Sequence, residues 1–305
     1  MPKAVKFNEY GSSEVLKVVD VPMPEADDDQ VVVEVRAAGI NPGEAKIREG
    51  LMHQAFPATF PSGEGTDFAG TISAIGANVS GFEVGQAVAG YTHDRASHAE
   101  YVVVPATNVT IKPDDVSWEV AGSLYVAGTT AYAAVHAISP TATDTVIVSG
   151  AGGGVGAIAA HYAVTLGAKV YGIAGPHDQE WLESRNIHPI TYDEDITEQI
   201  KAAGIAPTGF IDTVGKDYVK LAIKLGILPD KIDTITDFTA IKTYGVKGDG
   251  SAAATGISYL KTLLDLVASG AIEVPIAKTF PLDQVKDAYD FLANQHHRGK
   301  VVLIP

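Results

Sequence analysis

The chain contains no cysteine among its 305 residues. Disulfides, thiolate nucleophiles and thiolate metal sites are therefore excluded. The first ten residues hold no apolar signal core and no run of 18 apolar residues occurs, so we expect a cytoplasmic protein without a membrane-spanning segment. Runs of Lys or Arg are also missing, and the net charge is −15. This balance disfavours partners such as nucleic acid and anionic membranes.

The most informative segment is a glycine-rich turn between two apolar runs. Val146–Val148 leads into the turn, an Ala-rich helical pattern follows it, and Val170–Ile173 is the second apolar run. Strand, tight turn, helix and strand in this order are one half of a dinucleotide-binding fold. The fingerprint positions are Ala151, Gly153 and Gly156. They supply a small residue for the turn, a bare backbone for the pyrophosphate, and close packing of the helix on the strand.

Residues 1–123 have the pattern of a β-rich domain. Short β-branched runs alternate with Gly, Pro, Asn and Asp, and no long helical period occurs before about Ser117. Helical spacing then continues from Ser117 to Ala137. The expected strands of this part include Val31–Val35, Thr71–Ile75 and Ala99–Val104.

From Thr145 the chain alternates between strand and helix, which is typical of a doubly wound parallel sheet. We expect strands at 145–149, 169–173, 188–192, 208–213 and 232–235, and helices at 154–166, 178–186, 195–203, 216–225 and 258–269, with Asp237 capping a further short helix. The tail returns to strand, helix and strand at 275–280, 283–293 and 300–304. These last strands do not belong naturally to the nucleotide sheet. The predicted domains are therefore a discontinuous one, 1–123 with 272–305, and a nucleotide-binding one, 124–271.

Seven motifs in register resemble the medium-chain dehydrogenase/reductase superfamily, and within it the zinc-free quinone oxidoreductases related to zeta-crystallin. In chain order the motifs are Ala38–Pro42, Gly65–Gly70, Ala99–Tyr101, Gly128–Tyr132, Ser149–Gly156, Asp212–Gly215 and His296–Leu303. The resemblance implies an α/β protein with a GroES-like β-rich domain plus a Rossmann domain, an active site in the cleft between them, and a homodimer joined through the nucleotide sheet.

Zinc-dependent members of the superfamily resemble this chain too, and they hold zinc with a Cys after the first glycine turn and a His in a Gly-His-Glu motif. Here those positions are Asn41 and Thr66, and neither residue is a good zinc ligand. The four-Cys structural zinc lobe is impossible without cysteine. We therefore expect no metal site. Hydride transfer without a Lewis acid suits acceptors already activated by conjugation, which need only orientation and hydrogen bonds.

The resemblance also implies which residues contact the dinucleotide. These residues are Gly150, Ala151, Gly152, Gly153, Gly154, Val155, Gly156, Ala174, Gly175, Tyr192, Val214 and Gly215. Ala174 stands where an acid would bind the ribose 2′-hydroxyl, so NADPH is favoured, with NADH as the alternative. Tyr192 matches a family tyrosine near the 2′-phosphate, although a purely structural tyrosine is equally consistent with the sequence. Gly215 is also consistent with a plain strand-to-helix turn.

Two acids weaken the preference for NADPH. Asp178 and Glu180 follow the second strand, where a 2′-phosphate would meet their negative charges. The expected Lys or Arg is absent there, and only His177 and Arg185 could offset the acids.

Three residues are candidates for catalysis. Asn41 occupies the position of the zinc-binding Cys, and its alternative role is a turn residue before Pro42. Thr130 lies on the helix that the family places beside the nicotinamide, and its alternative role is a bond to the preceding helical turn. Lys46 replaces the usual aromatic residue of the quinone pocket. It could donate to a developing enolate or be a solvated surface residue.

The sequence thus predicts a zinc-independent, NADPH-dependent oxidoreductase that reduces a small-molecule quinone or enone. Two alternatives remain open at this point. One is an NAD(P)-dependent alcohol dehydrogenase, and the other is a non-catalytic NADPH-binding protein that serves redox sensing or structure, as crystallins do.

Overall fold

The computed structural model describes all residues from 1 to 305. Contacts divide the chain into two compact units. Unit 1 comprises Met1–Val126, Gly256–Ala268 and Ile276–Pro305, and unit 2 comprises Ala127–Thr255 and Ser269–Pro275. Residues 256–268, which the sequence analysis assigned to the nucleotide-binding domain, have their contacts in unit 1. None of the helices is both long and apolar enough to cross a membrane.

Unit 1 is built on a seven-stranded sheet and a three-stranded sheet. The large sheet has the order β14-β15-β3-β5-β6-β8, with β7 paired to β3, and the small sheet has the order β2-β1-β4. The strands are β1 (Lys3–Phe7), β2 (Lys17–Asp20), β3 (Gln30–Gly39), β4 (Ser62–Gly63), β5 (Asp67–Ile75), β6 (Ala87–Tyr91), β7 (Tyr101–Pro105), β8 (Val109–Ile111), β14 (Ile276–Pro281) and β15 (Lys300–Ile304). All of the strands expected in this part are present.

The last strands of the chain lie in the same sheet as the first ones. β15 pairs antiparallel with β3, with Val302 opposite Gly39 and Leu303 opposite Ala38. Side chains alternate across a strand, so Val301 and Leu303 share one face and pack into the same core as Phe7. This pairing brings Lys300 beside the end of β3, where it reaches the backbone oxygen of Ile40.

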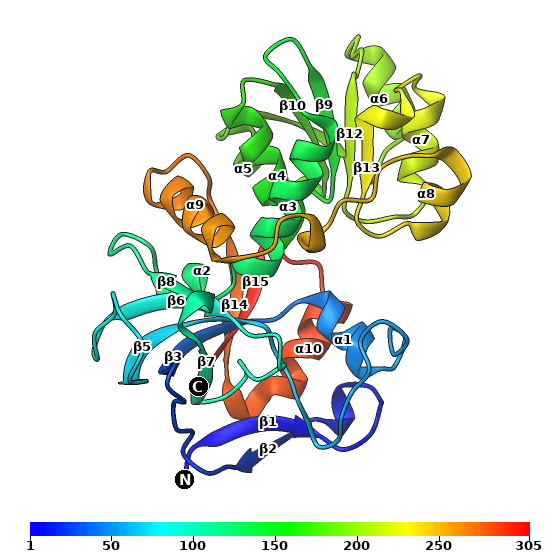
Figure 1. Cartoon of the computed structure of the whole chain (residues 1–305). Helices are drawn as coiled ribbons and strands as arrows, with labels where there is room; N and C mark the ends of the chain where they lie inside the picture. Colours follow the sequence, from blue (N-terminus) through cyan, green and yellow to red (C-terminus); the bar gives the residue numbers. More distant parts are fainter. The chain divides into compact units, whose positions relative to one another are not determined.

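The helices of unit 1 include one that the sequence analysis did not expect. α1 (Pro42–Arg48) begins directly after β3, whereas no helix was expected before Ser117. Asn41 is its N-cap, and the carboxylate of Glu44 accepts a hydrogen bond from the Asn41 backbone N–H, which forms a capping box. The remaining α-helices are α2 (Trp118–Ala121), the start of α3 (Tyr125–Ile138), α9 (Ile257–Ala268) and α10 (Val285–Asn294), and α10 packs on β14 and β15 (Figure 1).

The helix expected from Ser117 to Ala137 is interrupted. α2 ends at Ala121 and α3 begins at Tyr125. Between them, the Gly39 N–H donates to the Gly122 carbonyl at 2.7 Å. A Cβ on Gly122 would collide with the Ala37 carbonyl oxygen, so the break allows the chain to lie directly on β3. The helical pattern is confirmed on both sides of the break, and the break itself was not predicted because periodicity does not reveal this close backbone contact.

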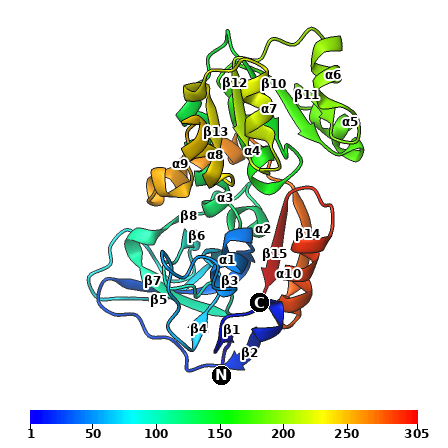
Figure 2. The same ribbon diagram turned by 90° about the vertical axis from the view of Figure 1, so that its right-hand side faces the viewer.

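Unit 2 contains a five-stranded parallel sheet in the order β11-β10-β9-β12-β13, which is a nucleotide-binding sheet order. The strands are β9 (Thr145–Ser149), β10 (Lys169–Ala174), β11 (Ile187–Thr191), β12 (Gly209–Asp212) and β13 (Ile232–Thr234), and the helices that follow α3 are α4 (Gly154–Thr165), α5 (Gln179–Glu183), α6 (Ile196–Ala202), α7 (Tyr218–Lys224) and α8 (Phe238–Tyr244). These elements confirm the expected strand–helix alternation. α5 and α6 lie beside β11 (Figure 2).

Candidate functional site

The glycine turn of unit 2 has the geometry that its sequence predicts. β9 ends at Ser149, and Gly150 adopts a φ of +65°, a conformation that favours glycine. The Gly153 N–H donates to the Gly150 carbonyl at 2.8 Å, which closes the turn. Gly153 is then the N-cap of α4, so the first N–H groups of a 12-residue helix follow the turn.

The surroundings of each fingerprint position explain why a small residue stands there. A Cβ on Gly156 would collide with the carbonyl oxygen of Gly150, so α4 lies against the turn only because no side chain intervenes. A Cβ on Gly153 would meet only that same carbonyl oxygen, at 3.2 Å, so its outer side is open for a ligand. Ala151 is fully buried, and its N–H donates to Ile173 of β10 at 3.0 Å. An open backbone at a helix N-terminus fits a dinucleotide pyrophosphate.

Asp212 organises the neighbouring turn after β12. Its Oδ1 accepts hydrogen bonds from the Ser149 hydroxyl at 2.8 Å, the Val214 N–H at 3.0 Å and the Gly215 N–H at 2.9 Å. Its Oδ2 accepts from the Thr234 hydroxyl at 2.8 Å. Thus one buried carboxylate joins the ends of three strands and fixes Val214 and Gly215 next to the glycine turn. Ligands of parallel α/β sheets bind at this edge.

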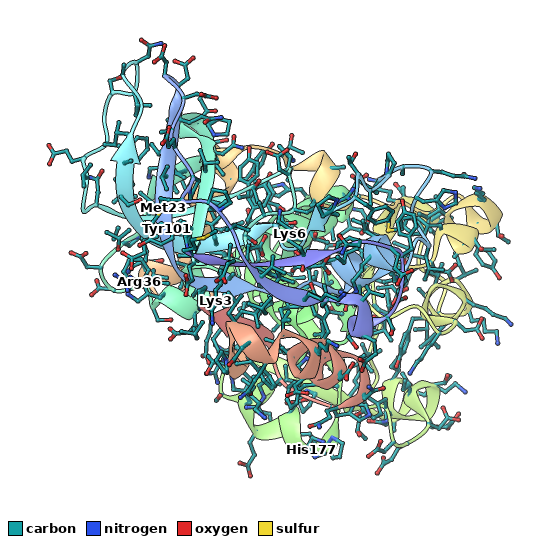
Figure 3. The ribbon with its side chains drawn as sticks, turned by 90° about the horizontal axis from the view of Figure 1, so that it is seen from below. Lys3, Lys6, Met23, Arg36, Tyr101 and His177 are labelled. Carbon is teal, nitrogen blue, oxygen red and sulfur yellow. The ribbon has the colours of Figure 1, made fainter.

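The end of β10 carries the residues predicted to distinguish the two cofactors. Ala174 and Gly175 are buried. A Cβ on Gly175 would lie 3.0 Å from the Tyr192 hydroxyl and 3.4 Å from Nε2 of His177, so both rings border this backbone. The His177 side chain is exposed and lies at the surface in Figure 3.

Arg185, the other residue predicted to offset the two acids, forms an ion pair with Glu273. Its guanidinium bonds the Glu273 carboxylate through Nε at 2.6 Å and also through Nη2, and it lies over the Trp181 ring at 4.6 Å. Asp178, by contrast, lies at the glycine turn: a Cβ on Gly152 would be 2.5 Å from its Oδ2.

The three catalytic candidates lie in different units. Asn41 and Lys46 belong to unit 1, and Thr130 belongs to unit 2. Thr130 is buried in α3, and Lys46 is exposed on α1.

Asn41 is held at every polar atom of its side chain. Its Oδ1 accepts from the Lys300 ammonium at 2.6 Å, and its Nδ2 donates to Glu44 at 3.1 Å and to Asp67 at 3.4 Å. Both side-chain N–H groups of Asn41 are therefore used within unit 1. Asp67 also accepts from the Val126 N–H at the start of α3. Burial raises the pKa of Asp67 to about 7, although the Lys300 charge acts in the opposite direction.

A second buried group surrounds Glu44, and sequence reasoning missed it. Arg48 donates to Glu64 at 2.5 Å and lies over the Tyr289 ring at 4.3 Å, and the Tyr289 hydroxyl donates to Glu44 at 3.2 Å. Burial raises the pKa of Glu64 to about 7, with Arg48 opposing the shift, and burial lowers the pKa of His98, which lies 4.0 Å from Glu44. Glu44 and Arg48 stand four residues apart, but Arg48 pairs with Glu64, which lies 16 residues away, so no local spacing indicated this pair.

The chain shows no group of three or more His, Asp or Glu side chains that could hold a metal ion. The absence of zinc stays a prediction, which rests on the identities of Asn41 and Thr66. The Thr66 N–H donates to Glu44 at 3.0 Å. This segment is therefore anchored to the Asn41 cluster, which comprises Asn41, Glu44, Asp67 and Lys300.

Two protein-family models match the chain. Residues 27–114 match the alcohol dehydrogenase GroES-like domain, and residues 206–303 match the zinc-binding dehydrogenase domain.

Individual proteins are similar over the full length of the chain. A quinone oxidoreductase of Salmonella typhimurium is 28% identical, with 100% of both chains covered. An NADPH-dependent alkenal/one oxidoreductase of Arabidopsis thaliana is 28% identical, covering 100% of this chain and 81% of the relative. The solved structure of Escherichia coli quinone oxidoreductase complexed with NADPH aligns with a TM-score of 0.84 and 25% identity, covering 99% of this chain and 100% of the other.

Proposed function

Because the chain belongs to the medium-chain dehydrogenase/reductase superfamily, we propose that it is a zinc-independent reductase that transfers hydride from NADPH to a quinone or an α,β-unsaturated carbonyl compound. The glycine turn from Gly150 to Gly156 carries this proposal, since its backbone fits a dinucleotide pyrophosphate. The quinone and alkenal/one oxidoreductases among its relatives support the acceptor class.

The residues of unit 2 would hold the dinucleotide in three places. The first N–H groups of α4 and the bare backbone of Gly153 bind the pyrophosphate. The turn at Val214 and Gly215, fixed by Asp212, supports the nicotinamide ribose. When bound, the reduced nicotinamide supplies the hydride.

The residues of unit 1 suit an acceptor that needs no Lewis acid. Asn41 and Thr66 stand in place of the Cys and His that hold zinc in other members, and neither residue is a good zinc ligand. Since Asn41 has both side-chain N–H groups engaged, we assign it a positioning role that shapes the start of α1. Thr130 and Lys46 are the remaining predicted donors to the acceptor oxygen, which gains negative charge during hydride transfer.

The test is oxidation of NADPH by the purified protein in the presence of a metal chelator. A quinone, an enone, and the saturated ketone that matches the enone are offered separately, and absorbance of the reduced nicotinamide is followed. The proposal predicts turnover with the quinone or the enone and none with the saturated ketone. Zinc-dependent turnover of the saturated ketone would favour an alcohol dehydrogenase, and cofactor binding without any turnover would favour a non-catalytic protein.

A further inference from the structure

An acidic side chain lies over the glycine turn. Asp178 ends the 3₁₀ turn η3 (Pro176–Asp178), which follows β10. A Cβ on Gly152 would lie 2.5 Å from Oδ2 of Asp178 and 2.9 Å from its Cγ. Asp178 lies four residues after Ala174 in the sequence, and its carboxylate lies against the backbone that precedes α4.

Asp178 and a second carboxylate act on the same tyrosine. Partial burial and then the charges of Asp193 and Asp178 raise the pKa of Tyr192, so both carboxylates lie near its hydroxyl. That hydroxyl borders Gly175. Arg185 bonds to Glu273 instead, and His177 is the single basic residue between Ala174 and Glu180.

We infer that Asp178 determines the cofactor specificity of the chain, by accepting a hydrogen bond from the adenosine ribose hydroxyls and by disfavouring a 2′-phosphate. This inference rests on the proposed function. In Rossmann sites that prefer NADH, an Asp or Glu at the end of the second strand does this work. Here that position is occupied by Ala174, which has no carboxylate, and Asp178 supplies the acid from the following turn. The preference for NADPH is therefore small, and the chain accepts NADH as well.

The size of the effect follows from the charges. A 2′-phosphate carries nearly two negative charges, and a carboxylate a few ångströms away at a solvated surface opposes it by roughly a factor of three to ten in affinity. NAD⁺ lacks this phosphate and escapes the repulsion. Neutralising Asp178 must therefore change the two affinities differently.

Isothermal titration calorimetry with NADP⁺ and with NAD⁺ tests the inference without turnover. Asp178→Asn keeps the size of the side chain, and Asp178 makes no side-chain capping bond to α5. We expect this variant to bind NADP⁺ about three- to tenfold more tightly and NAD⁺ no more tightly than the wild type does. Glu183→Gln is the matched control, because it removes one charge at an exposed position of α5, and it should leave the ratio of the two dissociation constants unchanged.

Equal changes for both dinucleotides in Asp178→Asn, or no gain for NADP⁺, would overturn the inference and leave the proposed function standing. If the wild-type protein binds neither dinucleotide, the proposed function fails, and the inference fails with it. A melting temperature measured for each variant verifies that the comparison is made between folded proteins.

Discussion

Gly156 allows α4 to approach the end of β9, and its replacement tests the glycine turn. In Gly156→Ala the new Cβ would collide with the Gly150 carbonyl oxygen, which is backbone and cannot rotate away. We expect a loss of about 1–3 kcal/mol in unfolding free energy and at least a tenfold weaker affinity for NADP⁺. Urea denaturation and calorimetry measure the two effects.

Gly250→Ala is the control for this substitution. Gly250 has a φ of −112°, and a Cβ there would meet no atom within 4 Å. If Gly156→Ala bound NADP⁺ as the control does, the turn would not be the dinucleotide site.

Lys300 provides the positive charge of the Asn41 cluster. Lys300→Met removes the donor to Asn41 and takes from the buried Asp67 carboxylate the positive charge that lowers its pKa. We expect a loss of about 3–5 kcal/mol in unfolding free energy at pH 8. The loss should be smaller at pH 5, because Asp67, with a pKa of about 7, binds a proton there. The exposed Lys17→Met is the control, and a loss that is the same at both pH values would contradict the role given to Asp67.

Glu64 makes stability depend on pH. Its pKa is raised from 4.5 to about 7 in the folded chain, so between these values the folded state binds a proton that the unfolded state has released. Its contribution to stability is complete below about pH 4 and is lost as pH rises through 7. Glu64→Gln should therefore remove about 1–3 kcal/mol of the decline in unfolding free energy between pH 5 and pH 8.

Urea denaturation at the two pH values measures this decline. His98 has a lowered pKa and acts in the opposite sense, but it is present in both proteins and its contribution cancels in the comparison. The exposed Glu25→Gln should leave the decline as it is in the wild type. If the unfolding free energy of Glu64→Gln declined between pH 5 and pH 8 as much as that of the wild type, Glu64 would be ionised over this whole pH range.

At the scale of elements, the turn after β12 depends on one carboxylate. Asp212→Ala leaves the N–H groups of Val214 and Gly215 and the hydroxyls of Ser149 and Thr234 without their acceptor. We expect a loss of about 2–4 kcal/mol in unfolding free energy, together with weaker binding of NADP⁺. Asp212→Asn retains the oxygen that accepts three of the four bonds and should lose less than half as much. Equal losses in the two variants would contradict the hydrogen-bonding role.

The elements of unit 2 were predictable because local pattern and tertiary structure agree there. β9 spans Thr145–Ser149 as expected, and α4 ends one residue before the predicted limit. Asp237 caps α8 as expected, accepting from the Ala240 N–H. β9 and β10 are largely apolar runs, and α4, α6 and α8 each begin at a glycine or at an aspartate that caps the helix.

The elements around Asn41 were less predictable. α1 has only seven residues, and Pro42 and Gly43 at its start indicate a turn rather than a helix. Its stability comes from a capping box and from partners distant in sequence, such as Tyr289, which lies 245 residues after Glu44. The sequence therefore identified Asn41 but not the network that holds it.

At the scale of the whole molecule, the chain combines a GroES-like unit with a Rossmann unit. Each unit has its own hydrophobic core: Val31, Val33 and Phe68 belong to one, and Ile147 and Phe210 to the other. The buried polar cluster lies in unit 1 and the glycine turn lies in unit 2. The chain passes through the β-rich unit first and returns to it at the end, so both termini belong to unit 1.

The reaction that we propose for this chain is hydride transfer from NADPH to a conjugated acceptor without zinc. The most direct measurement uses NADPH deuterated at nicotinamide C4, a metal chelator and an α,β-unsaturated ketone, with mass spectrometry of the product. We expect a saturated ketone that carries deuterium on its β-carbon, formed at the same rate with and without the chelator. A product that lacks deuterium, whichever of the two C4 hydrogens of NADPH is replaced by deuterium, would contradict this hydride transfer. Activity that the chelator abolishes and zinc restores would contradict the independence from zinc.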